Sequence, residues 1–479
     1  MVALAIVNSG ISPFEPLALH NQVSPWGFIL LAKLMAFFFG PGDLQFRLPG
    51  MLIYFCSVFY LGQYWKRRFG NFFSFAFTFI LLSNPFLLRY ATEFKHYVFE
   101  FSFAIFILVG YLEYRQGFRR GILVYSLAIA LSLFFGISII FVVASVFTVE
   151  MISRMRRSFW GAVTSCWMLA HAVFFVLFLV WYFVSIAPNL KFNVENYQDF
   201  FGIELEAAQL LDADYWGTVY EILGSSILPA HSIVFMLSGL TVVLLWIVDE
   251  VNLRKPAFAF FPLIYLFVYA LNFLGLYPIL LDRHLMFILP SLYLIYGWIV
   301  KKLSGLFKIQ AFQIILLIIL VGISSIYLLD AHLNRKYYFQ EFKPLLKSLS
   351  SKDHVILHFA AQPGYYWYRE SIYPWLPEPI NPPVNAQSGP MIPVEQMRSD
   401  FEENLTRPGA FPAVAQLTMT DDAYLYSEYL LEQVVSAGDS RLVVSHRSGK
   451  QLRNMIGEVC EYTYLARTKA SYILEISCP

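Results

Sequence analysis

Between Leu44 and residue 329 the sequence is a succession of long apolar runs, and this pattern constrains the fold more than any other feature. Only 14% of the residues are charged and 58% are hydrophobic, whereas soluble domains carry about 25% charged residues. A run of about 20 apolar residues is long enough to cross a bilayer as a helix. We therefore predict a polytopic α-helical membrane protein.

The hydropathy predicts about ten membrane spans. Their expected ranges are 44–65, 70–88, 97–114, 121–136, 138–153, 160–186, 231–250, 256–276, 285–300 and 311–329. The run at 26–39 is shorter and contains Lys33, so we expect an amphipathic helix at the membrane interface. A boundary between two spans is expected at 134–138; the alternative is that residues 121–153 are miscounted.

Basic residues cluster at every second junction between the predicted spans. The clusters are Lys66–Arg68, Arg115 with Arg119–Arg120, Arg154 with Arg156–Arg157, Arg254–Lys255, and Lys301–Lys302 with Lys308. Positive charge marks the cytoplasmic side of a membrane protein, so these junctions are expected in the cytoplasm. The remaining junctions, including the acidic loop 187–230, are then extracytoplasmic.

This topology divides the chain into three parts. Residues 1–43 form an outer-face segment with the interfacial helix, residues 44–330 form the transmembrane domain, and residues 331–479 form an extracytoplasmic domain of soluble composition. In the last part, helices are expected at 343–349, 428–436 and 452–459, and strands at 354–359, 441–445, 462–467 and 471–476. This pattern predicts a small α/β domain.

Two cysteines flank the last pair of predicted strands. Cys460 and Cys478 are equidistant from Lys469, the centre of the hairpin, so they could face each other across the strands. Because an extracytoplasmic location permits disulfides, we predict a bond between them.

A concentrated group of charges separates two of the apolar runs. Arg89, Glu93, Lys95 and His96 lie within eight residues, and charges close to hydrocarbon usually face a protein interior or a water-filled cavity. Helical spacing would place Arg89, Glu93 and His96 on one face. The alternative interpretation is a solvated loop between two membrane helices.

Basic, acidic and imidazole groups at an outward-facing membrane surface suit a lipid that carries a phosphate. Arginine offers bidentate contacts to phosphate oxygens, and a carboxylate can act as general base for an acceptor hydroxyl. A polyprenyl-phosphate sugar donor fits, because its phosphate needs stabilisation as it leaves. The sequence has no nucleotide-binding glycine motif and no nucleophile elbow, and its net charge of +1 argues against nucleic-acid binding.

Four motifs occur in an order that resembles bacterial GT-C glycosyltransferases of the family 39 type, relatives of protein O-mannosyltransferases and lipid A aminoarabinose transferases. The motifs lie at 16–25, 39–49, 93–97 and 282–290. The resemblance implies an inverting transferase on the outer face of the bacterial cytoplasmic membrane. It would move a sugar from a polyprenyl-phosphate-linked donor to a lipid, glycan or protein acceptor of the cell envelope.

Within these motifs and the charged group, ten residues are the expected substrate-binding positions. They are His20, Gln22, Arg47, Arg89, Glu93, Lys95, His96, Asp282, Arg283 and His284. Alternatives remain open for four of the positions. Arg47 could anchor its helix at the interface, Asp282 and Arg283 could form a local ion pair, and His284 could be a buried core residue.

The chain departs from the family at its start. The resemblance implies a first span followed by an acidic residue that serves as catalytic base, and the residues from Met1 to Asn8 look like those that come just after it. We therefore expect that this chain lacks the first helix and that the principal acid belongs before Met1, which leaves Glu93 as a candidate. The alternative is that the 26–39 helix spans the membrane, and in a complete chain Glu15 would be the nearest substitute acid. Some relatives use a divalent metal, but no ligand cluster here demands one. The rival functions are a lipid-linked-sugar transporter or flippase and a catalytically inactive membrane scaffold.

Overall fold

The computed structural model describes most of the helical region and most of the C-terminal domain. The described residues are 25–40, 43–93, 95–163, 165–186, 257–273, 286–306, 310–333, 343–358, 361, 365, 368–369, 373–380, 423–444, 450–468 and 471–479. The chain divides into two compact units. One is a helical unit formed by residues 24–31 and 44–333, which includes only the first part of α2. The other contains residues 32–43 and 334–479.

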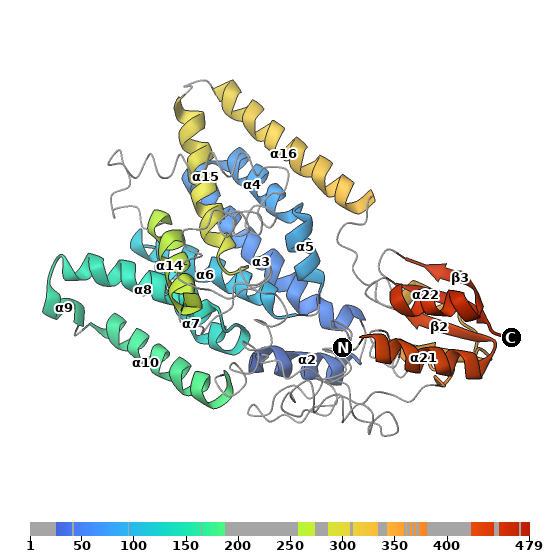
Figure 1. The fold of residues 1–479 in the computed structure, drawn as a ribbon. Helices are drawn as coiled ribbons and strands as arrows, with labels where there is room; N and C mark the ends of the chain where they lie inside the picture. Colours follow the sequence, from blue (N-terminus) through green and yellow to red (C-terminus); the bar gives the residue numbers. More distant parts are fainter. Residues whose placement is uncertain are drawn as a thin grey trace. The chain divides into compact units, whose positions relative to one another are not determined.

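Apolar α-helices make up the helical unit (Figure 1). They are α2 (Trp26–Phe39), α3 (Asp43–Phe69), α4 (Asn71–Leu82), α5 (Pro85–Thr92), α6 (Tyr97–Arg115), α7 (Arg119–Phe135), α8 (Ile139–Met155), α9 (Phe159–Val163), α10 (Cys166–Trp181) with a π turn at Tyr182–Ile186, α14 (Ala257–Phe273), α15 (Leu289–Leu306) and α16 (Gln310–Leu333). Every predicted span coincides with helix except 231–250, which lies outside the described residues.

Length and composition qualify three of the described helical segments to cross a membrane. They are Leu44–Phe69, Tyr97–Arg115 and Trp167–Val184, and the bent pair α4–α5 would be a fourth. These apolar helices agree with an integral membrane protein. The total of about ten spans and the interfacial position of α2 stay predictions.

The predicted boundary between residues 134 and 138 is confirmed. Helix α7 ends at Phe135 and α8 begins at Ile139, so residues 121–153 form two helices. Helices α6 and α7 are joined through Gly117, whose φ of 84° favours glycine. The two helices pack closely, because a Cβ added at Gly121 would lie 2.4 Å from the backbone nitrogen of Tyr114.

The predicted span 70–88 is wrong in one respect, because it is broken rather than continuous. Helix α4 ends at Leu82, and α5 follows at an angle of 60°. The physical reason is the Asn84–Pro85 pair, since a residue before proline disfavours helical backbone. The Asn84 side chain accepts hydrogen bonds from the backbone N–H groups of Phe86 and Leu87 and donates to the Tyr293 hydroxyl at 2.9 Å.

Two buried glutamates form ion pairs with basic residues at one end of the helical unit, which we call the basic end. Glu113 on α6 forms ion pairs with Arg67 and Arg120 and accepts a hydrogen bond from Tyr60. Glu150 on α8 forms ion pairs with Arg115 and Arg154. Three of the predicted cytoplasmic junctions therefore meet at the same end, as the charge pattern predicts. Residues 254–255 and 308 lie outside the described residues.

The second unit contains a four-stranded sheet with the order β1-β2-β4-β3. Its elements are α17 (Lys343–Leu346), β1 (Val355–Leu357), α21 (Ala423–Ala437), β2 (Ser440–Val444), α22 (Lys450–Val459), β3 (Glu461–Arg467) and β4 (Tyr472–Ser477). Strands β1 and β2 are parallel, and the other pairs are antiparallel. The predicted α/β fold and terminal hairpin are confirmed, with boundaries shifted by a few residues at some elements.

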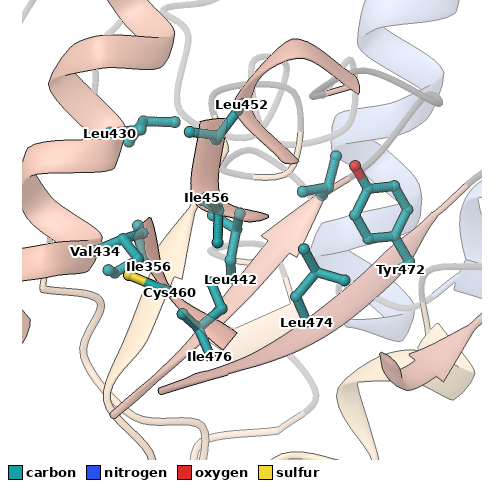
Figure 2. Close-up of a cluster of buried hydrophobic side chains, with 11 residues drawn as sticks. Ile356, Leu430, Val434, Leu442, Leu452, Ile456, Cys460, Tyr472, Leu474 and Ile476 are labelled. Carbon is teal, nitrogen blue, oxygen red and sulfur yellow. The ribbon is translucent and has the colours of Figure 1, made fainter. Parts of the chain in front are cut away.

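Alternate residues of the strands face two separate cores, as the two-residue period of a strand requires. Ile356, Leu442 and Leu474 pack with residues of α21 and α22 on one face, which Figure 2 shows. Val443 and Ile473, each next in sequence, pack on the other face with leucines of the 345–349 segment. Apolar cover on both faces explains why β1 and the middle of β2 and β4 are apolar, whereas β3 at the edge of the sheet is mostly exposed.

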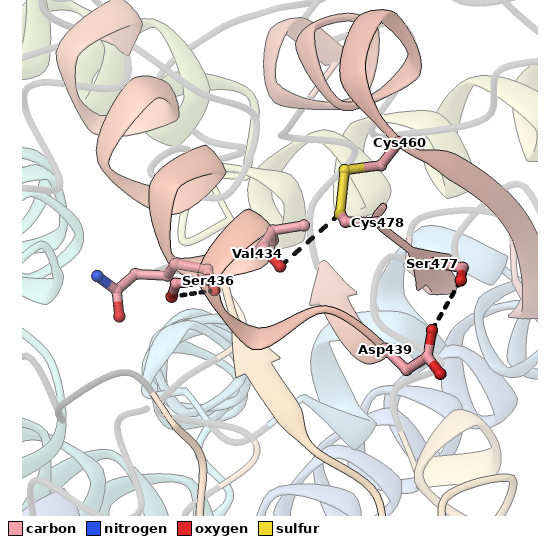
Figure 3. Close-up of a disulfide and its surroundings, with 7 residues drawn as sticks. Val434, Ser436, Asp439, Cys460, Ser477 and Cys478 are labelled. Atoms are coloured by element: carbon pink, nitrogen blue, oxygen red, sulfur yellow. Dashed lines mark hydrogen bonds between the residues drawn. A yellow bond between two sulfur atoms is a disulfide. The ribbon is translucent and has the colours of Figure 1, made fainter.

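The predicted disulfide between Cys460 and Cys478 is present (Figure 3). Glu461 and Ser477 are paired across β3 and β4, so the next residue outward on each strand is a cysteine. The bond closes the open end of the hairpin, at the place where α22 enters β3.

Candidate functional site

The short helix α5 places Arg89 at the end of the helical unit opposite the basic end. Phe86, Leu87 and Tyr90 of α5 are buried, which leaves Arg89 on the partly exposed face with its guanidinium 5.1 Å from the Tyr90 ring centroid. Helix α6 separates the two ends, because it runs from Tyr97 to Arg115 and a helix rises about 1.5 Å per residue, roughly 28 Å in total.

Glu93 lies between two basic side chains. Its Oε1 atom is 2.9 Å from Lys95 Nζ, and its Oε2 atom is 3.9 Å from Arg89 Nε. All three side chains are between 21% and 30% exposed, so they are accessible but partly shielded from water. We call these residues, Arg89, Glu93 and Lys95, the Glu93 cluster. With two cations and one carboxylate, it carries a net charge of +1.

The predicted single helical face is wrong for His96. Helix α5 ends at Thr92, and Glu93 has an extended backbone with φ −82° and ψ 134°, so the i,i+3 relation between Glu93 and His96 is not helical. The His96 ring instead lies 4.4 Å from the Tyr97 ring and 6.2 Å from the Phe28 ring. His96 therefore belongs to an aromatic contact between α2 and α6, next to the Glu93 cluster in sequence.

Arg47 lies near the same end of the unit on α3. Arg47 is exposed. Gly50, about one helical turn further on, lies close to the α5–α6 junction, because a Cβ added there would be 3.1 Å from the backbone oxygen of Ala91 and 3.2 Å from Val98. The junction between α5 and α6 therefore contacts the first turns of α3. This arrangement fits either interpretation of Arg47, the substrate contact or the interfacial anchor.

Five of the predicted site residues lie outside the described residues. They are His20, Gln22, Asp282, Arg283 and His284. The segment that follows the last three is described: Phe287 is fully buried, and its ring lies 5.5 Å from the ring of Phe141 near the start of α8.

The segment that begins at Met1 also lies outside the described residues, which start at residue 25. The expectation that the principal acid belongs before Met1 therefore stays a prediction. The candidate acid within the chain, Glu93, is described, and its carboxylate contacts Lys95 and Arg89. A carboxylate between two cations is suited to holding them in place, whereas a general base must also reach the acceptor hydroxyl.

Sequence reasoning missed a buried carboxylate next to this site. Glu100 is 1% exposed in the first turn of α6, and its Oε1 atom accepts a hydrogen bond of 3.0 Å from the backbone N–H of Ser138. A Cβ added at Gly136 would lie 2.5 Å from Glu100 Cγ. Glu100 thus fixes the α7–α8 turn. The signal was a glutamate near the start of the apolar run 97–114, well before Glu113 at its end.

The Glu93 cluster has the chemistry of an anion site rather than of a metal site. Lysine and arginine side chains donate hydrogen bonds to phosphate oxygens, and arginine matches their geometry. Within the part of the chain that the structure describes, no three His, Cys, Asp or Glu side chains come together in a way that could hold a metal ion. The divalent metal considered from the resemblance stays untested.

Comparison with known proteins gives two structural similarities. No protein-family model matches the chain, and no curated protein matches it. The chain is similar to a crystal structure of ArnT from Cupriavidus metallidurans bound to undecaprenyl phosphate, with 12% identity and a TM-score of 0.49. It is also similar to the same protein in the apo state, with 11% identity and a TM-score of 0.47. Each comparison covers 94% of this chain and 87% of the other.

Proposed function

We propose that this protein is a membrane glycosyltransferase that moves a sugar from a polyprenyl-phosphate-linked donor to an acceptor of the cell envelope, with inversion, on the outer face of the bacterial cytoplasmic membrane. The Glu93 cluster is the observation that carries the proposal. It combines two basic side chains with one carboxylate at the end of the helical unit opposite the basic end. A lipid phosphate presented from the bilayer would meet such a site directly.

In this proposal, each residue of the Glu93 cluster has a role in sugar transfer. Lys95 and Arg89 bind the phosphate oxygens of the donor and stabilise the charge that develops as the sugar–oxygen bond breaks. Glu93 contacts both cations and so holds them at one place. The acceptor hydroxyl oxygen bonds to the anomeric carbon from the face opposite the phosphate while the bond from that carbon to the phosphate oxygen breaks, which inverts the configuration. The polyprenyl phosphate leaves, and the hydroxyl proton passes to the released phosphate. One of the two ArnT structures holds undecaprenyl phosphate, a lipid of the class proposed here.

A transfer assay tests the proposal. Purified protein in vesicles receives a polyprenyl-phosphate donor with a radiolabelled sugar, together with an extract of cell-envelope acceptors. We expect label in the acceptor fraction and a loss of most transfer in Lys95→Gln. The control is Lys352→Gln, which removes an exposed lysine of the C-terminal unit. Label that crosses the vesicle membrane while still attached to the polyprenyl phosphate would instead identify a transporter.

Sidedness is a separate requirement of the proposal. A reporter that is active only outside the cytoplasm, fused after Asp330 on α16, is expected to be active, because the basic end is expected in the cytoplasm. The matched fusion after Arg157 at the basic end is expected to be inactive. The opposite pattern would place the Glu93 cluster in the cytoplasm and overturn the outer-face assignment.

A further inference from the structure

The arginines of the basic end fall into two groups with different surroundings. Arg67 and Arg120 pair with Glu113, and Arg115 and Arg154 pair with Glu150. Arg156 and Arg157 are exposed, and they differ from these four because the described part of the chain shows no ion pair between either of them and an acidic side chain. Their positive charge is therefore available to a ligand.

Large aromatic side chains lie beside these two arginines. Helix α8 ends at Met155, and α9 begins at Phe159. The turn between them is fixed by hydrogen bonds from the backbone N–H groups of Arg157 and Ser158 to the Arg154 carbonyl, at 2.9 and 3.0 Å. Phe159 is 50% exposed and Trp160 is 74% exposed. Apolar rings and guanidinium groups thus share one exposed corner, formed by Arg156, Arg157, Phe159 and Trp160.

We propose that this α8–α9 corner binds the headgroup of an anionic phospholipid. Exposed tryptophan and phenylalanine at the end of a membrane helix are typical of the interface between acyl chains and headgroups. Basic residues at that depth attract anionic lipid. Aromatic rings and basic side chains occur together at this corner. The rings contact the upper acyl chains, and the guanidinium groups contact the lipid phosphate. This proposal is independent of the sugar-transfer function.

Lipid retention measured by native mass spectrometry tests the proposal. Detergent-solubilised protein is mixed with equal amounts of phosphatidylglycerol and phosphatidylcholine. The wild-type protein is expected to retain the anionic lipid preferentially, and Arg156→Gln with Arg157→Gln is expected to reduce that preference by about fivefold for each arginine. Lys347→Gln with Lys352→Gln, which removes two exposed charges from the C-terminal unit, is expected to keep it.

Further variants separate the two parts of the corner. Trp160→Ala is expected to lower retention of both lipids while keeping the preference, because the ring contacts acyl chains rather than charge. Inorganic phosphate at millimolar concentration is expected to leave the bound lipid in place. The proposal would be overturned if the double arginine variant kept the wild-type lipid preference, or if the Lys347 and Lys352 control lost that preference to the same extent. It would also be overturned if Trp160→Ala retained both lipids as well as the wild type, or if free phosphate displaced the bound lipid.

Discussion

Glu93 and Glu113 each contact two basic side chains, but their exposure gives them different roles. The Glu113 side chain is 0% exposed and that of Glu93 is 30% exposed. A buried carboxylate between arginines stabilises the folded state only while all its partners are present. A half-buried one can exchange its contacts with a ligand. Both glutamates lie near the ends of apolar runs, so the sequence alone does not distinguish the two cases.

Glu93→Gln is expected to act mainly on donor binding. Because Oε1 of Glu93 lies 2.9 Å from Lys95, neutralising the carboxylate releases the lysine from its position. We expect the KM for the polyprenyl-phosphate donor to rise about tenfold, equivalent to ~1.4 kcal/mol, while kcat falls less than about threefold. Steady-state kinetics measures both. A loss of about 100-fold in kcat at constant KM would contradict this role and identify Glu93 as the general base.

Glu113→Gln is expected to destabilise the helical unit. The substitution removes the partner of Arg67 and Arg120, and we expect a loss of roughly 2–4 kcal/mol, somewhat below that of a fully buried pair because both arginines are partly exposed. Thermal unfolding in detergent measures the loss. The control is Arg119→Gln, an exposed neighbour at the same end. Equal stability of the two variants would show that the Glu113 ion pairs contribute nothing.

At the scale of elements, the sequence predicted helices and strands better than it predicted their junctions. The α7–α8 boundary was predictable because Gly136 and Ser138 interrupt an apolar run. The α4–α5 break was missed, although the Asn84–Pro85 pair is a known helix-ending signal, because the apolar run continues through it. The extended backbone at Glu93 was also missed, since charge spacing alone does not show where a helix ends.

Gly121→Ala tests the close contact between α6 and α7. The added methyl would lie 2.4 Å from the backbone nitrogen of Tyr114, so the helices must separate, at a cost of about 1–3 kcal/mol. Gly322→Ala on α16 is the control, because no atom of the described residues, apart from the backbone of its own helix, lies within 4 Å of its added Cβ. We expect a lower unfolding temperature only for Gly121→Ala. Similar temperatures for both variants would mean that the two helices adjust without cost.

The double substitution Cys460→Ser and Cys478→Ser tests how much the disulfide of the terminal hairpin stabilises the C-terminal unit. A bond that spans 18 residues is expected to stabilise the C-terminal unit by about 3 kcal/mol. Reduced unfolding temperature of that unit is the expected result, measured by calorimetry. Cys56→Ser, which changes a free cysteine, is the control. An unchanged transition in the double variant would show that the bond contributes no net stability.

Across the whole molecule, the charge pattern predicted which junctions lie at the same end of the helical unit. It did not predict which acidic side chains form ion pairs with their basic residues. Alternate basic junctions converge at the basic end because helices of similar length run back and forth. The partners Glu113 and Glu150 come from different helices, and only the packed structure shows that each contacts two arginines. Likewise, the motif order placed Arg47, Glu93 and Lys95 in one family pattern. Only the structure shows that their helices are adjacent, since a Cβ added at Gly50 would lie 3.1 Å from the backbone oxygen of Ala91.

The proposed function requires the Glu93 cluster to bind a polyprenyl phosphate, and equilibrium binding of that lipid measures this property without the transfer reaction. The measurement compares a fluorescent polyprenyl phosphate with the wild-type protein, with the double variant Arg89→Gln and Lys95→Gln, and with the control Lys347→Gln and Lys352→Gln. Two charge-assisted hydrogen bonds to phosphate are lost in the first variant, so its Kd is expected to rise about 100-fold while the control keeps the wild-type Kd. An unchanged Kd in the Arg89 and Lys95 variant would show that the Glu93 cluster does not bind the lipid phosphate.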